Sequence, residues 1–201
     1  MKIILWTIII LMAFTFILAG ILKGEELYEP DYKLINSNDD IEIREYSDII
    51  LASTRIDRSY EEATSPGFRV LANYIFGGNQ DEVQISMTSP VIYKLDSSST
   101  FSFIMPESWL GKELPKPNND NIFFDVVKNQ YVAVLEFGGY AKQEICVRKH
   151  REMSQVLQNL GIKINNNYSV AVYQAPYQVL NRKNEIWIEL NESQIKQLFP
   201  N

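Results

Sequence analysis

The chain begins with an apolar stretch of 20 uncharged residues, from Ile3 to Leu22. As a helix rising about 1.5 Å per residue, it would span about 30 Å, the thickness of a bilayer's hydrocarbon core. Lys2 precedes it and Lys23 with two glutamates follows, which favours a cytoplasmic amino end. We therefore expect residues 1–23 to anchor the rest of the chain on the non-cytoplasmic side, either periplasmic or extracellular. A cleaved signal peptide, and hence secretion, is the alternative.

Beyond this stretch, residues 24–40 are polar and are expected to form a short tether. β-Branched runs then predict strands over 41–46 and 49–56. Phe68, Leu71 and Ile75 recur at helical spacing and predict a helix that Gly77-Gly78 ends. Two starts are possible for this helix. One is a Ser59-x-x-Glu62 capping box, and the other is an N-cap at Ser65 with Pro66 as the first helical residue. Strands are predicted next over 83–95, broken near Pro90, and over 100–105.

The second half repeats this plan at an offset of about 85 residues. A strand is predicted over 131–137, a helix over 141–160, and strands over 168–174 and 185–190. A sheet with one helix-covered face leaves its other face open, so we expect the two halves to pair. The expected fold for residues 41–201 is α+β: a twisted antiparallel β-barrel of two pseudo-symmetric β-α-β-β halves, with a groove on the pseudo-twofold.

The composition of the chain excludes several classes of binding site and enzyme. The chain has one cysteine and one histidine, which excludes an internal disulfide and sites that need several cysteine or histidine ligands. Lys2 and Lys23 are the only charged residues of 1–23, so residues 24–201 carry 17 basic and 25 acidic side chains. This acidic balance argues against binding nucleic acid. No G-x-S-x-G elbow and no phosphate-binding glycine loop occurs, and no constellation suggests an enzyme.

The candidate residues each allow two interpretations. His150 lies at the edge of the apolar stripe of the second helix, so it either caps the core or is a weak candidate for an axial haem ligand. Cys146, on the same stripe, is either a buried hydrophobe or a ligand or reactive thiol, and we expect the first.

In the last strand Ile186, Ile188 and Leu190 should face the core. The opposite face, with Glu185, Trp187 and Glu189, either meets solvent or lines a groove for a cationic ligand. Arg182 and Lys183 either bind a ligand carboxylate or are merely solvated. The first helix is more apolar than one core stripe needs, so it serves either the core alone or the core and a ligand wall.

Six motifs together resemble the SOUL haem-binding protein family. They occur in the family's order over residues 30–190: Ile43-Arg-Glu-Tyr46, Gly67-Phe-x-x-Leu-x-x-Tyr-Ile-x-Gly-Gly-Asn79, Met87-Thr-Ser-Pro-Val91, Leu114-Pro-Lys-Pro-Asn118, Phe137-Gly-Gly-Tyr-Ala-Lys142 and Asn184-Glu-Ile-Trp187.

This resemblance implies a barrel of two similar halves that binds haem or another tetrapyrrole non-covalently and without catalysis. It places the ligand between the first helix and the loop entering the last strand. The implied cofactor-binding residues are Phe68, Leu71, Tyr74 and Arg182, with Lys183 as second choice. No matched motif contains a histidine, so the resemblance implies no axial ligand.

The chain is also similar to effector-binding domains of the gyrase-inhibitor-like class. That similarity implies the alternative, a small-molecule effector-binding or hydrolytic domain with Glu189 and Trp187 in the groove. A purely structural envelope protein is a third possibility, and it would lack a binding pocket.

Overall fold

The structure, a computed structural model, describes residues 27–38, 41–56, 60–96 and 99–199. The predicted anchor and Ser59 of the predicted capping box lie outside these residues. Within them, no helix is both long and apolar enough to cross a bilayer.

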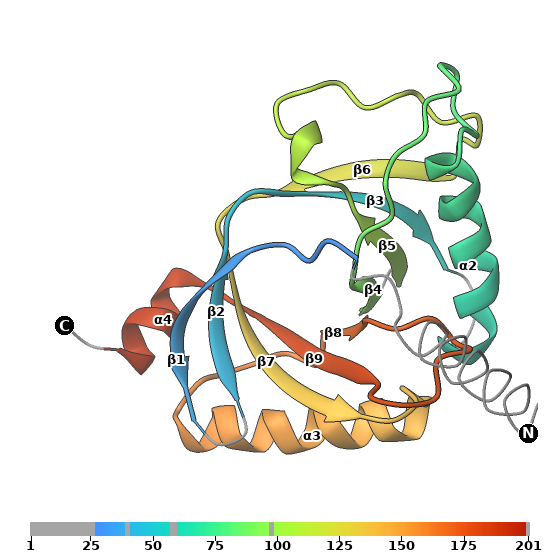
Figure 1. The fold of residues 1–201 in the computed structure, drawn as a ribbon. Coiled ribbons are helices and arrows are strands. Elements are labelled where there is room, and N and C mark those ends of the chain that lie inside the picture. Colours follow the sequence, from blue (N-terminus) through green and yellow to red (C-terminus); the bar gives the residue numbers. More distant parts are fainter. Residues whose placement is uncertain (1–26, 39–40, 57–59, 97–98, 200–201) are drawn as a thin grey trace, which may run out of the picture.

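A single curled antiparallel sheet of nine strands dominates the fold (Figure 1). Its order is β1-β2-β7-β9-β8-β4-β5-β3-β6. The strands are β1 (Tyr32–Ser37), β2 (Glu42–Tyr46), β3 (Ile49–Arg55), β4 (Val91–Leu95), β5 (Thr100–Ile104), β6 (Ile122–Val127), β7 (Gln130–Gly138), β8 (Tyr168–Val172) and β9 (Lys183–Leu190). The expected α+β fold class with a curled antiparallel sheet is therefore confirmed.

The sheet order is symmetric about the β4–β8 pair, where Tyr93 lies opposite Val170. Outward from this pair, β5, β3 and β6 on one side correspond to β9, β7 and β2 on the other. Each half therefore has one strand more than the predicted β-α-β-β plan. The extra strands are exchanged, because β2 pairs with β7 of the second half and β6 pairs with β3 of the first.

The strand β1 lies inside the segment that the polar pattern predicts to be a tether. It pairs with β2, Tyr32 opposite Tyr46, and forms one edge of the sheet. A short carboxy-terminal helix, α4 (Glu192–Leu198), is a further element that the pattern did not predict. Asn191 and Gln194 form its capping box, each side chain bonding the other residue's backbone N–H.

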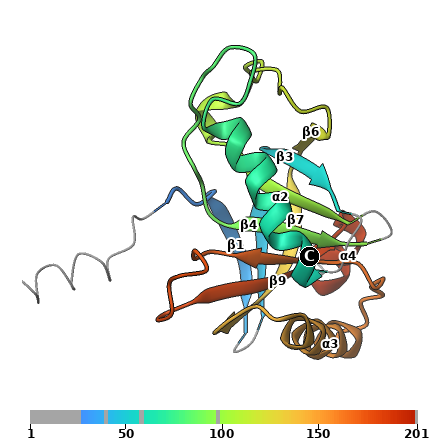
Figure 2. The same cartoon turned by 90° about the vertical axis from the view of Figure 1, so that its right-hand side faces the viewer.

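Two helices cover one face of the sheet (Figures 1 and 2). Helix α2 (Tyr60–Ile75) packs on β3 and β5, and α3 (Gln143–Asn159) packs on β9. Because α2 contains Pro66 in its interior, the structure favours the earlier of the two predicted starts. A Cβ on Gly78 would lie 2.5 Å from the Asn73 carbonyl oxygen, so only glycine allows this tight end to α2.

The two faces of the sheet form separate cores. Under the helices lie the even residues of β9, including Ile186 and Ile188, as the alternation predicts. The other face was expected to meet solvent or line a groove. Because the sheet curls, this face is instead closed into a second core, which contains Tyr46, Val132 and Trp187.

Candidate functional site

The predicted ligand wall on α2 is divided between core and surface. Leu71 and Tyr74 are fully buried in the core beneath the helix. The Tyr74 hydroxyl donates to the Pro115 carbonyl at 3.0 Å, and burial raises the pKa of Tyr74 to about 12. Phe68 is 40% exposed, with its ring edge-on to that of Phe103. Of the three, Phe68 therefore presents surface to a ligand.

Arg182 fastens the loop between β8 and β9. Its guanidinium lies 4.4 Å above the Tyr140 ring and donates to four backbone carbonyls. The accepting oxygens belong to Gly139, Gln174, Ala175 and Gln178, at 3.3, 3.3, 2.8 and 2.7 Å. Because these bonds use its donors, Arg182 holds the loop in place.

Lys183, the other predicted basic residue, points toward the centre of the second face. Its ammonium lies 3.5 Å from a carboxylate oxygen of Glu185, 3.6 Å from one of Glu29, and 4.0 Å above the Tyr173 ring. Its side chain is still 30% exposed. Lys183 therefore keeps surface on which a ligand carboxylate could replace Glu29.

Glu185 is the centre of a buried polar cluster that the sequence pattern missed. Its carboxylate is fully buried and accepts a 2.7 Å bond from the Tyr173 hydroxyl and a 2.6 Å bond from the Trp187 indole N–H. The Arg44 guanidinium donates to both of its oxygens, at 3.1 and 3.2 Å. With the Lys183 ammonium 3.5 Å away, the buried anion is therefore contacted by two cations and two neutral donors.

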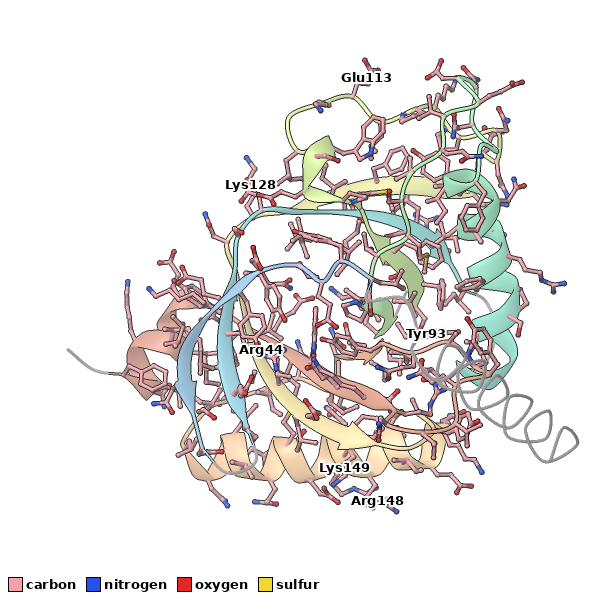
Figure 3. The ribbon with its side chains drawn as sticks, viewed as in Figure 1. Arg44, Tyr93, Glu113, Lys128, Arg148 and Lys149 are labelled. Atoms are coloured by element: carbon pink, nitrogen blue, oxygen red, sulfur yellow. The ribbon has the colours of Figure 1, made fainter. Side chains whose placement is uncertain are left out.

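Arg44, on β2 (Figure 3), supplies the cation that pairs with the buried Glu185 carboxylate. Its guanidinium also contacts Glu42 at 2.6 Å and lies 4.2 Å from the Tyr32 ring centroid. Burial is the largest single influence and lowers the pKa of Arg44, but the Glu185 carboxylate, Tyr46 and Glu42 together raise it by more, so the net shift is upward. The site is thus an internal ion pair. Arg44 and Glu185 belong to two of the six motifs, and the one available signal was their opposite charge.

The alternative site was assigned to Glu189 and Trp187, and the structure separates these residues. Trp187 is buried against Glu185, whereas Glu189 is exposed and pairs with Lys94 at 2.8 Å. Both side chains lie on the same face of β9, but the sheet closes over only the first part of that face. Glu185, two positions earlier than Trp187, is the acidic residue at the centre.

His150 stacks on another side chain of the core edge. Its ring lies parallel to that of Tyr168, with centroids 4.2 Å apart, and its Nε2 lies 3.3 Å from the Ser154 hydroxyl. Within the part of the chain that the structure describes, no three His, Cys, Asp or Glu side chains gather as a metal site. The His150 ring is therefore packed against Tyr168, and its role as an axial ligand stays a prediction.

We expect His150 to make the folded state less stable in mild acid. Burial lowers the pKa of His150 below its ordinary value of about 6.5, so the unfolded chain takes up the proton at higher pH. Stability is therefore full above pH of about 6.5 and falls as the pH drops below it. NMR titration of this single histidine, and urea unfolding at pH 7.5 and 5.5, test this. His150→Phe keeps the ring on Tyr168 and should remove this part of the pH dependence; an unchanged profile would contradict it.

Two surface cavities lie away from the predicted residues. One, of about 570 Å³, is near the end of α2 and is lined by Phe76, Gly77, Asn79, Gln80, Glu82 and Asn118. The other, of about 450 Å³, lies between β2, β7 and α3. Its cations Arg44 and Lys149 are paired with Glu42 and Glu152, at 2.6 Å each. Neither cavity is lined by the predicted cofactor-binding residues.

The fold recurs in solved structures. The C-terminal domain of EcmrR has a TM-score of 0.54 at 13% identity, covering 80% of this chain and 98% of that one. The EcmrR–DNA complex has a TM-score of 0.57 at 12% identity, covering 74% of this chain and 56% of that one. At these identities the likeness concerns the fold alone, a two-halved α+β domain.

The sequence comparison specifies the family. Residues 27–189 match the family model described as SOUL heme-binding protein, so the chain belongs to the SOUL family. It is 27% identical to heme-binding protein 2 of Mus musculus, over 88% of this chain and 95% of that protein. It is 29% identical to heme-binding protein 2 of Homo sapiens, over 75% of this chain and 78% of that protein. The family resemblance inferred from the six motifs is confirmed.

Proposed function

We propose that the chain binds haem or a related tetrapyrrole non-covalently and without catalysis. The observation that carries the proposal is the match to the SOUL family across residues 27–189, together with relatives named heme-binding proteins 1 and 2. A flat apolar ligand with carboxylate arms needs exposed apolar side chains and a nearby cation. In support of the proposal, Phe68 on α2 exposes an aromatic ring, and Lys183 at the start of β9 is partly exposed.

The contacts of the predicted residues indicate which of them would touch the ligand and which would support the site. Phe68 offers an exposed aromatic ring, and Lys183 keeps an accessible ammonium for a propionate. Leu71 and Tyr74 support the helix from within the core. Arg182 positions the loop, because its donors are already used by backbone carbonyls. Since His150 stacks on Tyr168, we propose that the porphyrin, and not an imidazole, carries the binding.

A membrane tether is part of this proposal. The length of residues 3–22, their lack of charge and the flanking lysines support a helix that crosses the bilayer. The folded domain would then lie on the non-cytoplasmic side.

A cationic small molecule is the second candidate ligand, and the buried Glu185 among Tyr46, Tyr173 and Trp187 is the observation in its favour. Such a ligand would have to displace Arg44 from both carboxylate oxygens. This competition makes the cation the weaker candidate.

Titration of the full-length chain in lipid nanodiscs with hemin tests the proposal. We expect a saturable Soret shift that empty nanodiscs do not give. Phe68→Ser should weaken binding about three- to tenfold, a loss of about 0.7–1.4 kcal/mol, because apolar contact with the porphyrin is removed. Lys183→Gln should weaken it by a similar factor.

Matched variants make the result specific. Phe76→Ser alters another exposed phenylalanine beside the end of α2, and Lys33→Gln alters another ion-paired lysine. Both should bind hemin as the unmodified chain does, and so should His150→Phe. Absence of saturation would overturn the tetrapyrrole proposal, and tighter binding of a fluorescent aromatic cation would favour the second candidate. Loss of binding in His150→Phe would overturn the porphyrin-only mode.

A further inference from the structure

The loop between β8 and β9 exposes an apolar surface. Tyr177 is 87% exposed, Val179 67% and Leu180 62%. These three residues lie within four positions of one another, in a loop from Gln174 to Arg182 that contains no acidic residue. The rest of the domain is strongly acidic, so this local composition is unusual for it.

The base of the loop is held firmly. Arg182 donates to the Ala175 and Gln178 carbonyls within the loop and to the Gly139 carbonyl outside it. The Gln174 side chain accepts a 2.6 Å bond from the Lys183 backbone N–H, and the Tyr140 hydroxyl donates to the Pro176 carbonyl at 3.5 Å. The apolar side chains are therefore presented outward from a fixed base.

The start of the described chain lies at the same place. Lys183, at the base of the loop, contacts Glu29 at 3.6 Å. Tyr28 is fixed beside it by a β-bridge to Thr88, and its carbonyl accepts from the Ser89 N–H at 2.8 Å. Figure 2 shows the β8–β9 loop projecting on the same side of the molecule as residues 27–31, which precede β1.

Chain length sets the distance from this point to the apolar segment. From Leu22 to Tyr28 is six residues, which reach at most about 22 Å when fully extended. From Lys183 to Leu180 is three residues, or about 10 Å. If residues 3–22 cross a bilayer, the loop lies within reach of that bilayer's surface.

We propose that Tyr177, Val179 and Leu180 insert into the headgroup region of the bilayer that holds the amino-terminal anchor. Tyrosine suits this depth because its ring is apolar and its hydroxyl remains hydrated. Valine and leucine supply apolar area, and the lack of acidic residues avoids repulsion from anionic lipids. The proposal rests on the membrane tether and gives the domain a fixed orientation on the membrane.

Site-specific fluorescence of the full-length chain tests this contact. Cys146, the only thiol, is buried and is first replaced as Cys146→Ser. Val179→Cys in this background is labelled with the environment-sensitive dye NBD and reconstituted into liposomes. Val126→Cys is the matched control, because Val126 is 56% exposed on β6, at the opposite edge of the sheet from β1.

At position 179 we expect blue-shifted emission and loss of about half the signal to lipids that carry a quencher just below the headgroup. At position 126 neither change should occur. If the chain floats with liposomes but both positions emit as in water, the loop contact is wrong and the tether stands. If carbonate extracts the chain from the liposomes, the membrane tether is wrong, and the proposed contact of the β8–β9 loop with the bilayer is wrong as well. A blue shift without lipid quenching would indicate a protein contact and overturn the proposal.

Discussion

Glu185→Gln should lower the free energy of unfolding by about 3 kcal/mol. The substitution leaves the guanidinium of Arg44 buried without its main counter-charge, which costs about 3–5 kcal/mol in buried pairs. We expect the lower end because Glu42 also contacts Arg44, at 2.6 Å. The glutamine amide would also place N–H donors at one of the two oxygen positions, both of which now accept from Arg44. Urea unfolding followed by tryptophan fluorescence measures the change.

Glu189→Gln is the control on the same strand. Glu189 is exposed and pairs with Lys94, so its loss should cost less than about 1 kcal/mol. Equal losses in the two variants would show that Glu185 is not the buried centre that its contacts indicate. Arg44→Met combined with Glu185→Leu should recover part of the loss, because it removes both buried charges together. If the double variant lost as much free energy of unfolding as Arg44→Met and Glu185→Leu lose separately and added together, the pairing would be contradicted.

The sequence could not locate this pair because its members are 141 positions apart. Each residue belongs to a motif of the SOUL resemblance, yet nothing local to either motif indicates which charge it meets. The alternation in β9 did predict the side of the strand on which Glu185 lies, because Ile186 and Ile188 face the helices. Curling of the sheet then decided whether that side was buried, and curling depends on all the strands together.

The absence of a local signal for long-range pairing also explains which helices and strands were predicted and which were not. Helices α2 and α3 were predicted within a few residues, because their apolar positions repeat locally and glycines end them. β6 was not predicted, because the strand it pairs with, β3, is distant in the sequence and gives no local signal. β1 was not predicted because its residues are mostly polar and exposed. Local pattern predicted the repeat and the fold class, but not the exchange of strands between the halves.

For the candidate site on α2, helical spacing alone could not distinguish a surface residue from a core residue. Phe68 and Leu71 are three positions apart, so they lie on neighbouring parts of one helix face. The structure shows the first at the surface and the second fully enclosed. This difference gives a prediction that separates structural residues from ligand-contacting ones.

Leu71→Ala should lower the free energy of unfolding by about 2–5 kcal/mol, because it opens a cavity in a core that α2 shares with the sheet. Phe68→Ala should cost much less, since its ring is partly hydrated already and contacts Phe103 at its edge. Urea unfolding of the two variants under the same conditions measures both changes.

Hemin titration of the same proteins, under conditions where both remain folded, gives the second readout. Leu71→Ala should bind within about twofold of the unmodified chain, because Leu71 offers no surface to a ligand. Phe68→Ala should bind about three- to tenfold more weakly despite its smaller loss of stability. The opposite order in binding would place the ligand inside the α2 core, which would then have to open to admit it. The ordering of the two variants therefore tests whether the tetrapyrrole binds on the surface of α2 or beneath it.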